Sequence, residues 1–159
     1  MLANLFSFDW RVAVDNIGLL IMAYILALPI GLNRESTSHF GLRTFPLVAV
    51  VSCGFMLVGI AVIDTSEGQA RVIQGIITGI GFLGGGAILK DQDRVVGTAT
   101  AASIWNTGAM GLAVAYGHLE IALSLSILNI LTLRFLGQLK TRILPHADPE
   151  EDAQPPADK

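Results

Sequence analysis

The densest group of charged residues that could do chemistry lies around one short polar segment. Arg34 and Glu35 follow the sequence Gly-Leu-Asn, and Arg43 and Thr44 follow Gly-Leu nine residues later. A carboxylate can accept hydrogen bonds from two guanidinium groups, so Glu35 is predicted to be a shared acceptor for Arg34 and Arg43. Thr44 is predicted to cap a helix that begins there. The alternative is that these residues are ordinary basic anchors at a membrane surface.

A second group of polar residues lies in an otherwise apolar stretch further along the chain. Thr100, Ser103 and Thr107 are three and four residues apart, so they share one face of a helix, and Asn106 follows Trp105 beside them. In lipid such a face needs hydrogen-bond partners, and we expect them on the glycine-rich helix that precedes it. The alternative is a polar lining for a site between these two helices. Thr100, at the start of this stretch, could also join the group of Arg34, Glu35, Arg43 and Thr44.

The titratable residues do not suggest catalysis or metal binding. Cys53 is the only cysteine, and the three histidines fall in predicted loops or in the tail. Magnesium prefers carboxylate oxygens, but no Asp or Glu lies in the central part of any long apolar stretch. We therefore expect no enzyme activity, no cofactor and no metal site.

A run of glycines marks the stretch from Val72 to Leu89. Gly79, Gly81 and Gly84 fit the pattern G-x-G-x-x-G, but a nucleotide site also needs a preceding strand and an acidic residue about 20 positions later, where Ile104 stands. Small residues four apart let two helices approach closely in lipid, so the stretch is predicted to pack against a neighbour, with the lining of a cavity as the alternative. The predicted packing residues are Gly75, Gly79, Gly81, Gly84 and Gly85.

The elements that must position these residues are membrane-spanning helices. Of the chain, 52% is hydrophobic and only 14% is charged, with a mean hydropathy of +0.61, which is unusual for a water-soluble protein. Uncharged stretches of about 20 residues can cross a bilayer. Five are predicted: Asn16–Asn33, Thr44–Ile63, Val72–Leu89, Val95–Gly117 and Ile121–Leu133, the last of which extends from Leu119 to Leu139 if Arg134 reaches the headgroups. The fold class is therefore an all-α polytopic membrane helix bundle.

The basic residues predict the orientation of this bundle. With five crossings, eight of the ten basic residues fall on one side, which by the positive-inside rule is the cytoplasm. The N-terminus is then outside and the C-terminus cytoplasmic. The eight are Arg34, Arg43, Lys90, Arg94, Arg134, Lys140, Arg142 and Lys159, and the other two are Arg11 and Arg71.

The two ends of the chain carry little sign of structure or targeting. The first residues lack the basic segment of a signal peptide, so the first helix is expected to be retained. Residues 1–142 form the predicted transmembrane domain, and residues 143–159, which are acidic and proline-rich, are predicted to be a disordered cytoplasmic tail. The net charge of −3 and the lack of a basic stripe argue against nucleic-acid binding.

Several motifs together resemble the MgtC/SapB family. They are Gly-Leu-Asn-Arg-Glu at 31–35, Gly-Leu-Arg-Thr at 41–44, Arg71, Thr-Gly-Ile-Gly-Phe-Leu-Gly-Gly-Gly at 78–86 and Thr-Ala-Ala-Ser-Ile-Trp at 100–105. The resemblance covers roughly residues 15–136 and points to Arg34, Glu35, Arg43, Thr44, Arg71, Thr100, Trp105 and Asn106 as site residues. It implies a five-helix protein of the bacterial inner membrane, which agrees with the topology predicted from charge.

The resemblance leaves two functions open. Family members are linked to growth in low magnesium and to virulence through membrane partners, notably ATP synthase, which implies a regulatory or interaction protein. The alternative is a transporter or channel for a divalent cation such as Mg²⁺. We favour the first, because the spans lack carboxylates. We also expect a homo-oligomer, and we expect this chain to lack the soluble C-terminal domain of MgtC itself.

Overall fold

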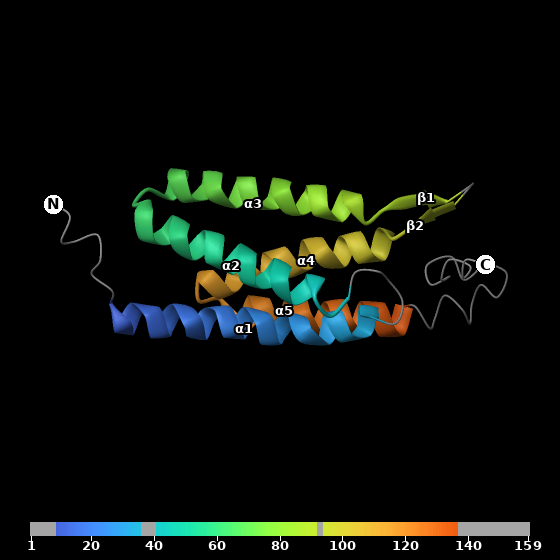
Figure 1. Ribbon diagram of the computed structural model, residues 1–159, viewed down its shortest axis with the longest axis horizontal. Helices are drawn as coiled ribbons and strands as arrows, with labels where there is room; N and C mark the ends of the chain where they lie inside the picture. The colour runs from blue at the N-terminus through green and yellow to red at the C-terminus, as the bar shows by residue number, and fades with distance from the viewer. Residues whose placement is uncertain (1–8, 36–40, 92–93, 137–159) are drawn as a thin grey trace.

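The computed structural model describes residues 9–35, 41–91 and 94–136, and its main elements are five long helices (Figure 1). These are α1 (Trp10–Glu35), α2 (Thr44–Val62), α3 (Ser66–Gly86), α4 (Thr98–Ala115) and α5 (Leu119–Leu131), which continues into a π-helical turn, η2 (Thr132–Leu136). Each predicted span overlaps one of the five helices, but α1 and α3 begin six residues before Asn16 and Val72, and the predicted span ends Leu89 and Val95 lie in short strands. The predicted tail, 143–159, lies outside the described residues.

The helices run back and forth between two ends of the bundle (Figure 1). The α2–α3 and α4–α5 connections lie at the end where α1 begins, and the strands lie at the end where η2 finishes. The described chain therefore starts and finishes at opposite ends, as an odd number of crossings requires. Which end faces the cytoplasm stays a prediction.

The helix α4 is the centre of the bundle. It packs against each of the other four helices, while α3 contacts only α2 and α4 to any extent. Half of the residues of α4 are buried, but of α3 only Ile80 and Gly84 are. The core is formed chiefly by α1, α2 and α4, and α3 lies along one edge (Figure 1).

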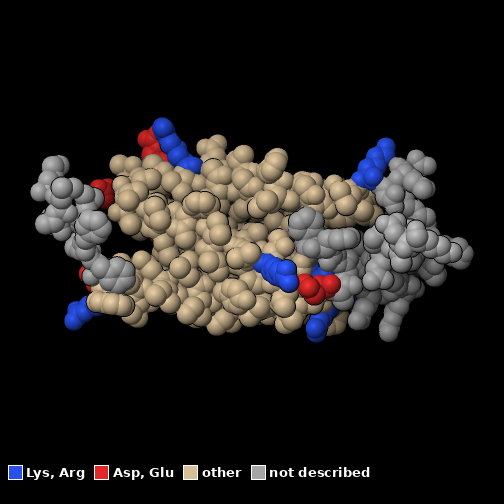
Figure 2. All heavy atoms as spheres, in the orientation of Figure 1, with Lys and Arg blue, Asp and Glu red and all other residues tan. Residues whose placement is uncertain are grey.

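The surface is that of a membrane protein. Many large hydrophobic side chains are exposed, and the face shown in Figure 2 has charged residues mainly toward its two ends, with a wide uncharged belt between them. Three helices are long and apolar enough to cross a membrane: α1, α2 and the continuous Leu119–Leu136 segment. The other two, α3 and α4, are less apolar because they carry polar side chains and many small residues.

Two short paired strands join α3 to α4, between the helices predicted over Val72–Leu89 and Val95–Gly117. Strands β1 (Leu89–Asp91) and β2 (Arg94–Val96) pair antiparallel, with Leu89 opposite Val96. Gly97 follows with a φ of 87°, in the left-handed region, and a Cβ there would collide with the carbonyl oxygen of Ala87. Gly97 thus lets the chain turn directly from β2 into α4.

The predicted close packing of the glycine-rich helix is largely wrong within the chain. Of its predicted packing residues only Gly84 makes a close approach, with its Cβ position 3.3 Å from the carbonyl oxygen of Ala101 in α4. The closest approaches of a helix glycine to another of the described helices are instead at Gly108 and Gly111 of α4, which face Ile80 of α3 and the backbone of Ala49 in α2. Open space surrounds the remaining four predicted residues, Gly75, Gly79, Gly81 and Gly85.

Candidate functional site

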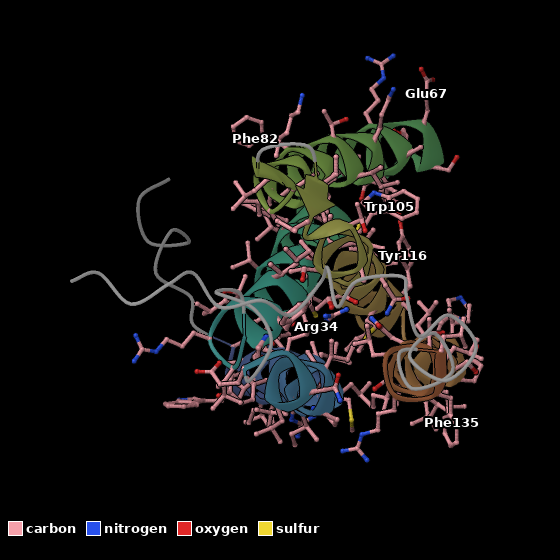
Figure 3. All side chains as sticks on the ribbon, turned by 90° about the vertical axis from the view of Figure 1, so that its right-hand side faces the viewer. Arg34, Glu67, Phe82, Trp105, Tyr116 and Phe135 are labelled. Atoms are coloured by element: carbon pink, nitrogen blue, oxygen red, sulfur yellow. The ribbon has the colours of Figure 1, made fainter. Side chains whose placement is uncertain are left out.

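The residues of the predicted arginine group do not converge. Arg34, in the last turn of α1, is only 6% exposed, and its side chain reaches into the bundle among α1, α2 and α4 (Figure 3). Arg43 directly precedes α2 and is exposed. One guanidinium is thus in the interior and the other on the surface, so the predicted convergence on a single carboxylate is wrong.

The carboxylate of Glu35 stabilises the start of α2 instead of bridging arginines. Its Oε2 accepts a hydrogen bond from the backbone N–H of Leu42 at 2.5 Å, and no ion pair joins it to Arg43 in the described part of the chain. The backbone N–H groups ahead of a helix have no partner within that helix, and a carboxylate is a strong acceptor for them. Glu35 therefore closes the turn between α1 and α2.

Two further predicted site residues have different roles from those expected. Thr44 does not cap α2: it is the first residue of that helix, Arg43 is in the N-cap position, and no side chain caps it. Arg71 lies in α3 toward the opposite end of the bundle, where its Nη2 forms an exposed ion pair with Glu67 at 2.8 Å. The α1–α2 turn and Arg71 therefore do not form one site.

The polar face of α4 is buried, and the hydrogen bonds of Ser103 and Asn106 go to α5 and not to α3. Ser103 donates a hydrogen bond from Oγ to Oδ1 of Asn129 at 3.0 Å, and Nδ2 of Asn106 donates to the carbonyl oxygen of Leu125 at 3.3 Å. Thr107 donates to the carbonyl oxygen of Ser103 one turn earlier, at 2.7 Å. The prediction of interhelical hydrogen bonding is right in kind, and the predicted neighbour is wrong.

Two residues of this polar interior are ones that the sequence interpretation missed. Ser126 of α5 donates to the carbonyl oxygen of Leu26 in α1 at 2.8 Å, which ties the first and last helices together. Asn129 accepts from Ser103, while its own Nδ2 is buried and has no hydrogen-bond partner among the described residues. The available signal was their polarity: serine and asparagine stand out in a helix that is otherwise almost entirely apolar.

The candidate site is therefore the polar interior between α1, α4 and α5. Its buried polar residues are Arg34, Thr100, Ser103, Thr107 and Ser126, with Asn106 and Asn129 partly buried beside them. Trp105 is not part of it, since it is 56% exposed and points away from the bundle (Figure 3). The site offers hydroxyl, amide and guanidinium groups, and no group of three or more His, Cys, Asp or Glu residues in the described ranges could hold a metal ion.

Comparisons with known proteins place these residues in a family. The model of the MgtC family matches residues 20–142, a segment that includes every helix from the middle of α1 onward. The chain is 37% identical over 135 residues to SrpB of Synechococcus elongatus, covering 76% of this chain and 74% of SrpB. No solved structure matches the chain.

Two other relatives are longer than the matched region. YhiD of Escherichia coli K12, named as a candidate magnesium transporter, is 32% identical over 133 residues, covering 79% of this chain and 62% of YhiD. MgtC of Salmonella typhimurium is 33% identical over 125 residues, covering 78% of this chain and 53% of MgtC. The chain thus spans less than two thirds of YhiD and about half of MgtC. From the family match and these relatives together, the chain belongs to the MgtC family, as its resemblance to MgtC/SapB proteins predicted.

Proposed function

We propose that this chain is a regulatory protein of the bacterial inner membrane that acts by binding other membrane proteins, in adaptation to low magnesium. The observation that carries the proposal is that the polar side chains of the interior bond to other parts of the bundle. Its hydrogen bonds, such as those from Ser103 to Asn129 and from Ser126 to the backbone of Leu26, join one helix to another or close a helix turn. These groups stabilise the bundle, which leaves its outer surface for partners.

The charge of the interior also supports binding over cation transport. The buried charged side chain of the described bundle is Arg34, a cation. A path for Mg²⁺ needs oxygen ligands, usually carboxylates, and a fixed positive charge along the path would repel the ion. Among the described residues, the buried polar groups also do not pair a nucleophile with a general base, which supports a binding role over an enzymatic one.

A second candidate function is transport of a divalent cation. The observation in its favour is the name of YhiD, a relative that is described as a candidate magnesium transporter. The two functions predict different results for purified protein in proteoliposomes. We expect Mg²⁺ entry no faster than into empty vesicles. Flux above that level, abolished when the bundle is unfolded, would favour the transporter and reject our proposal.

The partner is sought by affinity purification from native membranes. We expect a membrane protein complex, for which ATP synthase is the first candidate, to copurify with the chain and to do so more strongly after growth in low magnesium. A role in virulence would follow only if the bacterium needs that partner complex during infection. A chain that copurifies with no membrane protein under either growth condition would contradict the proposed binding role.

The orientation has its own test. A reporter fused after Arg142 should signal from the cytoplasm, and one fused at the N-terminus from the outside, because eight of ten basic residues lie on the predicted inner side. Both reporters on one side would contradict a five-crossing topology.

A further inference from the structure

A groove runs between α2 and α3 on the outer surface of the bundle. It has a volume of about 570 Å³, and α3 contributes Gly75 and Gly79 to its wall, opposite Leu47 and Phe55 of α2. Neither glycine has another atom within 4 Å of its Cβ position, so the groove is open along the backbone of α3. Its lining is almost entirely apolar.

A large apolar side chain projects beside this groove. Phe82 is 83% exposed, the highest value among the large hydrophobic residues of the described chain, and it points away from the bundle (Figure 3). Gly75, Gly79 and Phe82 are four and three residues apart, so they lie on one face of α3. One face of the helix thus carries both a projection and a depression.

The chemistry of α3 favours a protein neighbour over lipid. The exposed side of this helix also carries Gln74 and Thr78, with Thr78 donating its hydroxyl to the backbone of Gln74 at 2.8 Å. Helices with small and polar residues on one side associate with other helices in membranes, because backbones can approach closely and polar groups find partners. α3 is also not among the three helices of the described chain that are long and apolar enough by composition to cross a membrane.

We propose that the α3 face, formed by Gly75, Gly79 and Phe82 with the adjoining groove, pairs with the same face of a second copy of this chain. A two-fold axis along the membrane normal brings two identical faces together, with the two α3 helices parallel. Side chains on a helix lean toward its N-terminus, so each Phe82 ring covers the level of Gly79. In such a pair each ring enters the groove of the other copy next to Gly79. The inference is independent of the proposed function.

Cysteine cross-linking in native membranes tests the pairing. The only natural cysteine, Cys53, is fully buried and will not react across an interface. Gly79→Cys should form a disulfide-linked dimer under mild oxidation. Gly18→Cys on α1 is the matched control, because Gly18 is also exposed with nothing within 4 Å of its Cβ position, and it should remain monomeric. Equal cross-linking of both variants, or none at Gly79→Cys, would overturn the proposal.

Self-association of the purified chain gives a second test. Gly79→Leu and Phe82→Ala should each weaken dimerisation on the order of tenfold, a loss of about 1.4 kcal/mol, while Gly18→Leu leaves it unchanged. All three variants should keep the thermal unfolding midpoint of the monomer, since these positions make no close contact within the chain. A purified chain that is monomeric, or that dimerises as strongly with Gly79→Leu, would show that lipid or another protein covers this face.

Discussion

The helices α3 and α4 contain similar kinds of residue but use them in opposite ways. Both carry glycines and polar side chains within apolar sequence, with seven glycines in α3 and two in α4. In α4, Gly108 and Gly111 lie against neighbouring helices, and Ser103 and Asn106 bond to α5. In α3 most glycines are open, and Thr78 bonds only to its own helix.

The difference follows from position in the bundle and not from composition. A central helix such as α4 has neighbours on most of its sides, so most of its small residues make contacts and its buried polar groups lie near partners. A helix at the edge has neighbours on one side only, and the same residues on its other side remain available. Glycine spacing therefore shows which face of a helix can pack closely, while the position of the helix in the bundle determines whether its neighbour belongs to the same chain.

The largest expected effect on stability comes from leucine at a closely packed glycine of α4, compared with leucine at an open glycine of α3. A Cβ at Gly111 would collide with the carbonyl oxygen of Ala49 and approach Ser52, so Gly111→Leu should destabilise the fold by at least about 3 kcal/mol. Gly79→Leu should leave monomer stability nearly unchanged. Thermal unfolding in detergent measures both. A stable Gly111→Leu variant would mean that α2 and α4 can separate at little cost.

A smaller effect is expected from removing one hydroxyl in each helix. Ser103→Ala breaks the bond to Asn129 and leaves a partly buried amide oxygen without its donor, which should cost about 1 kcal/mol. Thr78→Ala removes an exposed bond within α3 and should have no measurable effect on monomer stability. Similar losses for the two variants would contradict the contrast between a buried and an open polar face.

The helices themselves could be predicted from sequence because the thickness of the bilayer fixes their length. Long uncharged stretches separated by short charged ones gave all five, and α2 was placed to within a residue at each end. The hairpin was missed because strands of three residues, such as Leu89–Asp91, are too short to show an alternating pattern.

The partners of the polar residues could not be predicted in the same way. The spacing of Thr100, Ser103 and Thr107 defines a face of α4 but does not show which helix that face meets. The preceding glycine-rich helix was chosen, whereas Ser103 and Asn106 bond to α5, which only the three-dimensional packing reveals. The same limit applies to Arg34, since its position next to Glu35 and near Arg43 gave no sign that its side chain turns inward.

A modest effect on stability is expected where a side-chain hydrogen bond joins the end of α4 to the start of α3. Tyr116, directly after α4, donates its hydroxyl to Oε1 of Gln69 in α3 at 3.1 Å. Tyr116→Phe removes this bond at a partly solvated site, so global stability should fall by only about 0.5 kcal/mol. Hydrogen exchange should rise in the first two turns of α3 and stay unchanged in α4. Faster exchange throughout α4 would contradict the view that α4 is held independently of α3.

The smallest effect is expected at the charged end of α3. Arg71 and Glu67 form an ion pair, but their side chains are 76% and 79% exposed, so water screens the attraction and the pair gains little over two solvated charges. Arg71→Ala should therefore leave the unfolding midpoint of the purified chain unchanged, at low and at high salt alike. The matched variant Glu67→Ala should behave in the same way, since each residue contacts the other and little else. A salt-dependent loss of stability in either variant would mean that charge holds this end of α3 in place. The contrast between a loosely held α3 and a tightly packed α4 would then apply only to the turns of α3 that lie within the membrane.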